Sequence, residues 1–334
     1  MEEVKKESFL KKFNRLNIAI EESISKDLSV FKKFLLMLDF IIEYKLYGVQ
    51  ILDYIQYGFY SKKRNERRKY IVHGKLLEIM KICNNPENRY IFDQKPEFDK
   101  NFSDLLQRDW IDTKVANINE FKKFIKNKEH FFAKQPDGMF GTGVKKIYTK
   151  DIENVESTFS SFQTNKILCE GTLTQCKEMA EFNTTSLNTL RVVTIVKANG
   201  KVEIMGGLLR VGRKGRVADN FHHMGIASFV EPNTGIVTTL GIDKNKDRHI
   251  VHPDSGKQII GFHIPFWEKV VKTVSEAALR FPDMRYIGWD VAITEDYNIA
   301  LIEGNPGADP DAEQITTKEG RWPYYEKFLK EMKK

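Results

Sequence analysis

The pattern of apolar positions changes along the chain and divides it into two regions. In the first ninety residues, apolar side chains recur every three or four positions, as in DLSVFKKFLLMLDFIIEY. That spacing is typical of amphipathic helices and predicts several helices over residues 1–82. The turn-forming run NNPENR, at residues 84–89, predicts a boundary. We therefore predict a helical N-terminal region over residues 1–90 and a second domain over residues 91–334.

From about residue 130, short apolar strands interrupted by glycine replace the helical pattern. TLRVVTIV and KVEIMGGLLRVG are joined by a polar turn that contains glycine, which predicts an antiparallel hairpin. GWDVAIT and NIALIEG form a second such pair, and residues 265–281 have helical periodicity. Antiparallel hairpins with helices packed beside them predict an α+β fold rather than a parallel nucleotide-binding sheet.

Composition narrows the class of protein without identifying its partner. Of 334 residues, 41% are hydrophobic and 30% are charged, which is typical of a globular protein with a core. The sequence has no run of eighteen apolar residues and no secretory signal at its start. Three cysteines without metal or redox spacing predict a reducing cytoplasm. The net charge of +7 fits anionic small molecules, nucleic acid or an acidic membrane surface, and does not decide between them.

A basic run, SKKRNERRKY at residues 61–70, has six basic residues and one Glu. Two interpretations stay open. The run is either a solvated helix face or a patch for polyanions or lipid, because the segment before it is rich in aromatic residues. Since the sequence lacks phosphate-reading motifs, we predict no nucleic-acid partner.

Polar side chains end the apolar strand IALIEGN. Glu303 and Asn305 lie one residue apart, so they point to the same face of the strand. Asp290 lies in the partner strand of the predicted hairpin, and pairing would bring it close to Glu303. Two carboxylates and an amide oxygen suit Mg²⁺, and close carboxylates on a buried strand need a cation or hydrogen bonds. The alternative is that Glu303 and Asn305 cap the loop that follows.

A glycine-rich segment follows Lys134, which ends another apolar strand. Its three glycines are Gly138, Gly141 and Gly143. Glycine lets backbone N–H groups approach an anion closely, and the lysine supplies positive charge, so the segment is typical of a phosphate-binding loop. It matches neither the Walker A nor the dinucleotide pattern, and hairpin turns also collect glycine.

Two arginines interrupt strands that are otherwise apolar. Arg191 lies among Leu, Val and Thr, and Arg210 lies in the adjoining strand. An arginine in such a strand needs a partner, and its guanidinium suits phosphate or carboxylate. The alternative is an edge or solvent-facing position, and for Arg213 and Arg216 it is the favoured interpretation.

In this order, these segments resemble the ATP-grasp enzymes and, more narrowly, the sugar-transfer-associated ATP-grasp proteins, which are related to α-L-glutamate ligases. The resemblance covers roughly residues 90–315. It rests on FDKNFSDLLQRDWID, FFAKQPDGMFGTGVKKI, SLNTLRVVT, LLRVG, DNFHHMGI, HPDSGK, IGWDVAIT and LIEGNPG. It implies an ATP-grasp fold of two α+β lobes with the nucleotide between them and a hinge near residues 168–175.

The resemblance also implies a nucleotide site. Lys134 would hold the α- and β-phosphates, and Lys95 would be the earlier lysine of the site, with Lys100 as the competing assignment. PDGMFGTG would close over the triphosphate. The remaining nucleotide-site residues that the resemblance implies are Glu170 near the adenine-binding hinge, Gln175 or Glu178 at the ribose, and Asn220.

Catalytic and metal-binding roles follow from the same resemblance. Arg191 and Arg210 would neutralise the γ-phosphate or an oxyanion. The ligands of two Mg²⁺ ions would be Asp290, Glu303 and Asn305.

The function that the resemblance implies is an ADP-forming ligase. ATP would activate a small-molecule or glycan carboxylate as an acylphosphate for attack by an amine, in surface polysaccharide or sugar-conjugate biosynthesis. Two alternatives are a phosphotransferase acting on a sugar or glycan hydroxyl, and a nucleotide-binding scaffold in a polysaccharide-assembly complex. The basic N-terminal helices would then contact a membrane surface or a glycosyltransferase.

Overall fold

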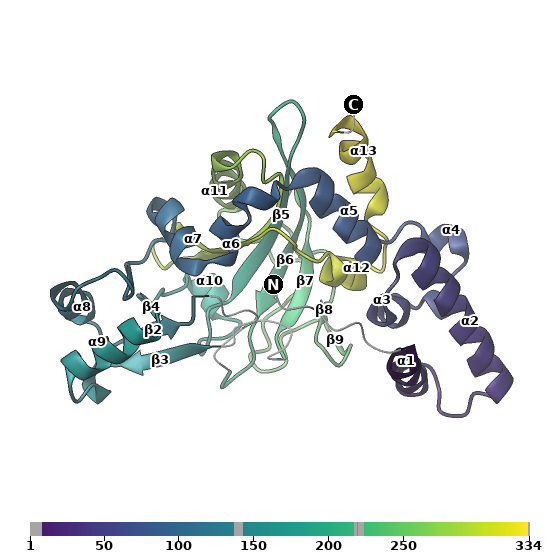
Figure 1. The fold of residues 1–334 in the computed structure, drawn as a ribbon, viewed down its shortest axis with the longest axis horizontal. Helices are drawn as coiled ribbons and strands as arrows, with labels where there is room; N and C mark the ends of the chain where they lie inside the picture. The colour runs from purple at the N-terminus through teal and green to yellow at the C-terminus, as the bar shows by residue number, and fades with distance from the viewer. Residues whose placement is uncertain (1–8, 137–142, 217–218, 220–223, 333–334) are drawn as a thin grey trace. The chain divides into compact units, whose positions relative to one another are not determined.

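Two compact units make up the chain in the computed structural model, which describes residues 9–136, 143–216, 219 and 224–332 (Figure 1). The first unit combines residues 1–82 with 309–330, and the second contains residues 83–308 with 331–334. The helical prediction for the N-terminal region is confirmed. The helices are α1 (Phe9–Ser23), α2 (Val30–Tyr47), α3 (Ile51–Gln56), α4 (Arg64–Arg67), α5 (His73–Cys83), α12 (Asp311–Thr317) and α13 (Trp322–Met332).

Residues 309–330 belong to the helical unit in the structure, whereas we assigned them to the second domain. The reason is visible at Gln314 of α12, which is almost fully buried. Its side-chain oxygen accepts from the backbone N–H of Ile71 at 2.7 Å, and its amide donates to the Ile71 carbonyl at 2.9 Å. One side chain thus satisfies both backbone groups of a buried loop residue, a requirement that no local sequence pattern reveals.

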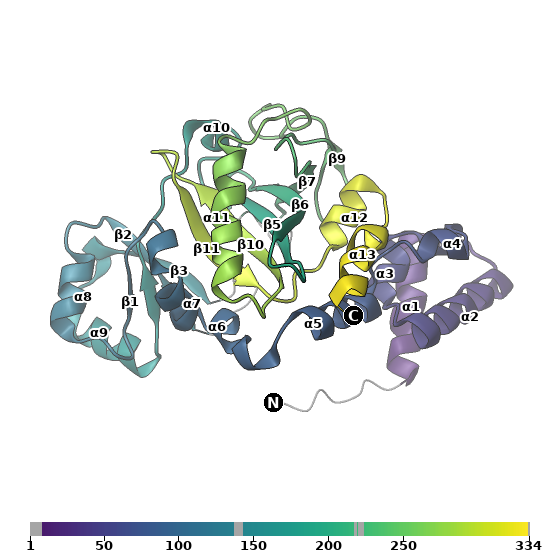
Figure 2. The same cartoon turned by 90° about the horizontal axis from the view of Figure 1, so that it is seen from above.

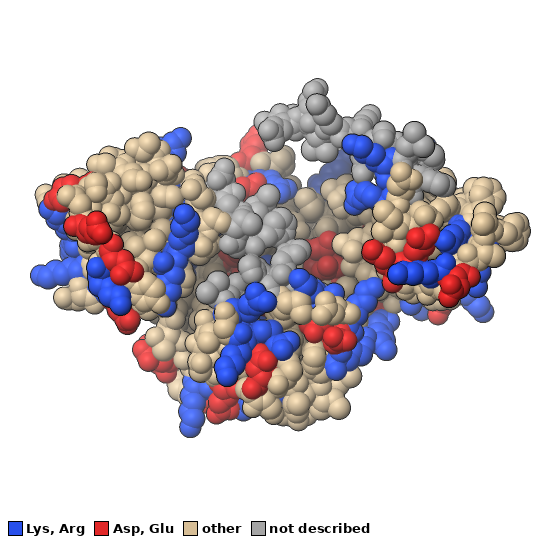
Figure 3. All heavy atoms as spheres, turned by 90° about the horizontal axis from the view of Figure 1, so that it is seen from below, with Lys and Arg blue, Asp and Glu red and all other residues tan. Residues whose placement is uncertain are grey.

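Inside the helical unit, part of the basic run turns inward. Arg67 binds both carboxylate oxygens of Asp39 at 2.8 and 2.9 Å, and it also contacts Glu43. Arg68 binds both oxygens of Glu43 at 2.9 and 3.1 Å. Two of the six basic residues are therefore structural. On the face shown in Figure 3, Lys and Arg side chains are interspersed with Asp and Glu, so the positive charge does not gather there.

The second unit contains a four-stranded antiparallel sheet in the order β1-β4-β2-β3. Its strands are β1 (Trp110–Asp112), β2 (His130–Lys134), β3 (Val144–Tyr148) and β4 (Leu168–Glu170). Two helices, α8 (Ile118–Ile125) and α9 (Val155–Thr164), share an aromatic core with the sheet. Phe131 and Ala133 of β2 enter this core, so the alternating side chains of Phe132 and Lys134 face the other way.

A seven-stranded antiparallel sheet follows, in the order β11-β10-β5-β6-β7-β8-β9. Its strands are β5 (Thr189–Val196), β6 (Val202–Val211), β7 (Ile226–Val230), β8 (Gly241–Ile242), β9 (Arg248–His249), β10 (Tyr286–Ile293) and β11 (Ile299–Asn305). Both predicted hairpins are confirmed, since β5 pairs with β6 and β10 pairs with β11. The remaining helices are α6 (Tyr90–Asp93), α7 (Lys95–Asn101), α10 (Lys177–Ala180) and α11 (Trp267–Arg280).

The seven-stranded sheet has one apolar face and one polar face. Figure 2 shows α11 lying across β5, β10 and β11, and buried residues such as Val192, Trp289 and Leu301 pack in the core cluster beneath it. Strand alternation then places the side chains of Arg191 and Asp290 on the opposite face. Glu303 joins them because the β10–β11 pairing shifts register between Asp290 and Val291, so that Glu303 rather than Ile302 lies opposite Asp290. The burial of one face therefore fixes where the candidate chemistry lies.

We expect Glu43→Gln to destabilise the helical unit by about 2–4 kcal/mol, because Arg67 and Arg68 would lose a fully buried anionic partner. Thermal unfolding followed by circular dichroism measures the change. Glu21→Gln is the matched control, since its ion pair with Lys33 at 2.6 Å is partly exposed and should contribute much less. Equal losses in the two variants would contradict this account.

Candidate functional site

Three charged side chains lie in one row across three adjacent strands. Asp290 of β10 is the direct neighbour of Glu303 on one side and of Arg191 on the other. The predicted proximity of Asp290 and Glu303 is therefore confirmed, and a register shift between Asp290 and Val291 sets their pairing. Arg210 of β6 lies opposite Thr189, two residues along β5 from Arg191 and on the same face. The sheet thus brings together two predicted carboxylates and both predicted arginines.

The Asp290 carboxylate is held by both arginines. Arg191 donates to its two oxygens through Nε and through Nη2, the latter at 2.9 Å. Nη2 of Arg210 lies 2.9 Å from Oδ2 of Asp290, and the same guanidinium donates twice to the Thr189 hydroxyl. Burial alone would raise the pKa of Asp290, but the two guanidinium groups hold that pKa well below its usual range. Asp290 is therefore a buried, ionised carboxylate.

Glu303 differs from its neighbour in exposure and in the direction of its pKa shift. Its side chain is 48% exposed, and its Oε1 accepts a hydrogen bond from the Asn305 amide at 3.1 Å. Partial desolvation and the adjacent Asp290 carboxylate raise the pKa of Glu303. Repulsion between two close carboxylates is the condition that a divalent cation relieves, so Asp290, Glu303 and Asn305 fit Mg²⁺. No group of three or more His, Cys, Asp or Glu side chains suited to a metal occurs among the described residues, so Asn305 would be the third protein ligand.

A second buried carboxylate holds the predicted phosphate lysine. Glu170, at the end of β4, accepts from Nζ of Lys134 at 2.6 Å and from Nε of Arg108 at 2.6 Å. Burial opposes ionisation of Glu170, but the two cations lower its pKa to about 2. Lys134 is therefore held at the end of β2 by an ionised partner.

Arg108 connects this carboxylate with the large sheet, and sequence reasoning missed it. Its guanidinium is almost fully buried, donates to the Leu301 carbonyl of β11 at 2.8 Å and lies 3.6 Å from Asp99 of α7. Burial and the nearby Glu170 raise the pKa of Asp99, while Arg108 partly offsets them. The only signal in the sequence was an arginine at the end of the apolar stretch in SDLLQRDW, within a segment quoted for the resemblance.

The two candidate lysines of α7 have different surroundings. Lys95 begins the helix, and its backbone N–H donates to the Pro136 carbonyl at 3.1 Å. Its positive charge is among those that lower the pKa of Asp99. Lys100 is exposed on the same helix. Lys95 is thus the lysine that lies near the Glu170 cluster.

The structure describes only one glycine of the loop after Lys134. Gly143 has a φ of +76°, and a Cβ there would lie 2.9 Å from the Gln135 side chain. Its carbonyl accepts from the Gln135 N–H at 3.2 Å. Gly138 and Gly141 lie outside the described residues.

The candidates for the ribose have side-chain partners within the protein. The Gln175 amide donates to the carbonyls of Asn183 and Ser186, and its oxygen accepts twice from Asn188. Both Glu178 oxygens accept from the Tyr297 hydroxyl, at 3.1 and 3.2 Å. A ribose would have to replace some of these bonds. Asn220 lies outside the described residues.

Sequence reasoning did not single out Asp219, a buried carboxylate that lies near Arg210. It accepts from the backbone N–H of Thr189 at 2.9 Å and from the Thr189 hydroxyl. Burial raises the pKa of Asp219, while Arg210, 3.9 Å away, lowers it. Asp219 thus helps to fix the threonine to which Arg210 donates.

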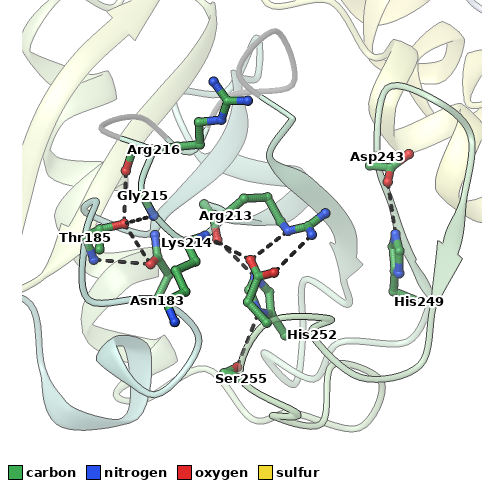
Figure 4. A network of polar contacts seen from close by, with 12 residues as sticks. Asn183, Thr185, Arg213, Lys214, Gly215, Arg216, Asp243, His249, His252 and Ser255 are labelled. Carbon is green, nitrogen blue, oxygen red and sulfur yellow. Dashed lines mark hydrogen bonds and ion pairs between the residues drawn. The ribbon is translucent and has the colours of Figure 1, made fainter.

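A network of polar contacts fixes the chain after β6 (Figure 4). Arg213 binds both oxygens of Asp254 at 2.7 and 3.0 Å, and the Lys214 N–H donates to the same carboxylate. The His252 ring bonds the Gly212 carbonyl at 2.9 Å. Figure 4 shows the Arg216 side chain pointing away from this ion pair. Arg213 therefore anchors the HPDSGK segment to the end of β6.

Three comparisons relate the chain to known proteins. Among solved structures, the chain is similar to the ATP-grasp ligase PsnB complexed with a minimal precursor, at 15% identity and a TM-score of 0.48, over 77% of this chain and 69% of that chain. It is also similar to D-alanyl-alanine synthetase A from Vibrio cholerae O1 biovar eltor str. N16961, at 11% identity and a TM-score of 0.47, over 75% of this chain and 68% of that chain. Among curated proteins, no sequence matches this chain. A family model described as sugar-transfer associated ATP-grasp matches residues 60–329. The predicted ATP-grasp fold is thereby confirmed, and the chain belongs to the sugar-transfer-associated ATP-grasp family.

Proposed function

We propose that the protein is an ATP- and Mg²⁺-dependent, ADP-forming ligase that activates a carboxylate for attack by an amine. Family membership supports an ATP-dependent ligase at the level of the superfamily, whose enzymes use ATP and Mg²⁺. The observation that carries the proposal is the row of Glu303, Asp290 and Arg191 across three strands, with Arg210 beside it. It combines two carboxylates for metal ions with two fixed cations for phosphate oxygens.

In this proposal, Lys134 and Lys95 bind the phosphates of ATP. Lys134 is held by Glu170 and Lys95 begins α7 near the same cluster, so both contribute positive charge to one region. The glycines after Lys134 would allow backbone N–H groups to approach the triphosphate.

Asp290, Glu303 and Asn305 would hold the Mg²⁺ ions. Bound Mg²⁺ supplies charge neutralisation at the transferred phosphoryl group. The protein contributes a carboxylate of low pKa, Asp290, and a half-exposed one, Glu303, on the same face of the sheet.

Arg191 and Arg210 would stabilise the negative charge that develops during transfer. The γ-phosphoryl group moves to a substrate carboxylate oxygen, ADP leaves, and an amine then displaces phosphate from the acylphosphate carbon. Both guanidinium groups are held by Asp290, and Arg210 also by Thr189, so their orientation needs little change during the reaction.

The description of the family as sugar-transfer associated supports the proposal of a sugar-linked substrate. We propose a carboxylate or amine acceptor in surface polysaccharide or sugar-conjugate synthesis.

The three cysteines are buried and unpaired, which supports a protein that acts in a reducing compartment. Burial raises the pKa of Cys83 and Cys169 to about 12. Thiols of such high pKa are poor nucleophiles at neutral pH, in keeping with a reaction that needs no enzyme nucleophile.

The reaction products distinguish a ligase from a phosphotransferase. With ATP, Mg²⁺, a sugar carboxylate and an amine, we expect ADP and free phosphate in equal amounts, together with the condensed product. Enzyme-coupled assays measure ADP and phosphate, and mass spectrometry identifies the product. ADP without free phosphate, accompanied by a phosphorylated acceptor, would contradict the ligase and favour the kinase.

Glu303→Gln should lower ATP turnover by roughly 100-fold or more, because it removes a carboxylate from the metal site. The matched control is Glu295→Gln in the exposed turn of the same hairpin, which should keep parental turnover. ADP release at saturating Mg²⁺ is the measurement. If Glu303→Gln turns over like the control, the metal assignment is wrong.

Lys134→Met should raise KM for ATP by about 10- to 100-fold, the effect of losing one charge-assisted contact to phosphate. Glu170→Gln should also raise KM, by a smaller factor, because Lys134 keeps its charge but loses its fixed partner. Lys122→Met is the control, since Lys122 pairs with Glu156 at the same 2.6 Å but on the exposed surface. Steady-state kinetics over ATP concentration give the comparison. An unchanged KM in Lys134→Met would remove Lys134 from the nucleotide site.

A further inference from the structure

Helix α2 presents an apolar face to solvent along its whole length. Phe31 is 70% exposed near its start and Leu46 is 65% exposed near its end. Between them, at intervals of three or four residues, lie the exposed side chains of Phe34, Leu35, Leu38 and Ile42. This spacing places all six side chains on one side of the helix, over about 22 Å.

The two acidic residues of α2 lie at one flank of the apolar face, towards the buried side of the helix, where arginines neutralise them. Glu43 is fully buried and Asp39 is partly buried. Arg67 and Arg68, from the basic run, bind these two carboxylates. Apolar side chains therefore occupy both the buried and the exposed face of this helix, and an acid, Glu43, lies on the buried side.

The charges that remain exposed on α2 are cations. Lys45 is exposed within the apolar face, between Phe34 and Leu38 around the helix, and Lys32 is exposed at the flank that also carries the two acids. Lys33, by contrast, is paired with Glu21 at 2.6 Å. Residues 1–82 as a whole carry 17 Lys and Arg against 11 Asp and Glu.

An apolar helix face with exposed lysines matches the surface of an anionic bilayer in both its apolar character and its positive charge. Anionic lipid headgroups attract the ammonium groups, and the acyl boundary below them accepts Phe and Leu side chains. Long lysine side chains can reach headgroup phosphates while their methylene stems stay in the apolar layer. Among the described helices, none is long and apolar enough to cross a membrane.

We propose that α2 is a membrane-surface anchor that lies flat on a bilayer containing anionic lipids. Its apolar face enters the headgroup region, and Lys32 and Lys45 pair with headgroup phosphates. The proposal does not depend on the reaction at the ATP site, because it uses residues of the helical unit alone.

Sedimentation of the full chain with sucrose-loaded vesicles tests this anchor. One vesicle set is phosphatidylcholine alone, and the other contains about one third phosphatidylglycerol. We expect at least tenfold tighter binding to the anionic vesicles, weakened by added salt. Equal binding to both sets, or binding to neither, overturns the proposal.

Single substitutions locate the contact. Leu38→Glu should weaken binding to the anionic vesicles at least tenfold, because it places an acid in the centre of the apolar face. Leu77→Glu is the matched control, since Leu77 of α5 is 50% exposed and lies outside α2. Lys45→Glu should reduce the preference for phosphatidylglycerol. Unchanged helical content and ATP turnover would show that each variant is folded.

Two outcomes would show that α2 is not the membrane anchor. If Leu38→Glu binds vesicles as the parent chain does, α2 is not the contact. If light scattering shows a dimer that Leu38→Glu separates, while vesicles bind neither protein, the face joins two copies of the chain and the proposal is overturned.

Discussion

The ionised carboxylate of Asp290 is the centre on which the polar face of the large sheet depends. Removing an anion from water is costly, and this one remains charged because Arg191 and Arg210 contact it from neighbouring positions. The same contacts hold the two guanidinium groups in place on β5 and β6. Without Asp290, two partly buried cations would lose their shared partner. Glu303 then owes its raised pKa to burial and to the fixed charge beside it.

The small sheet repeats this arrangement with a different acid. Glu170 holds Lys134 and Arg108, as Asp290 holds two arginines. Arg108 also donates to Leu301, two residues before Glu303 in β11. Lys134, Arg191 and Arg210 are thus each oriented in advance by a buried carboxylate. Such orientation lowers the reorganisation needed when a polyanion binds, although phosphate oxygens must compete with the resident acids for the cations.

The sequence predicted those features that follow from strand periodicity and turn chemistry. The two hairpins were enough to bring Asp290 close to Glu303, but their direct pairing depends on a register shift between Asp290 and Val291 that the alternation of side chains does not predict. The role of Arg108 could not be predicted, because its partners Glu170 and Leu301 are far away in the sequence and no period relates them. For the same reason, the sequence alone could not show that residues 309–330 join the helical unit through Gln314.

Helix α2 shows a further limit of prediction from sequence, because its apolar residues occur on every side of the helix. Periodicity predicts that such a segment is helical but does not determine which face is buried. In the structure, the buried face is the one that carries Glu43, and the choice depends on Arg67 and Arg68 from a later segment. Buried ion pairs often contribute little net stability compared with apolar packing of similar volume. Leaving six large apolar side chains outside while an acid, Glu43, is buried is therefore not explained by the stability of the unit, which favours a function for the exposed face.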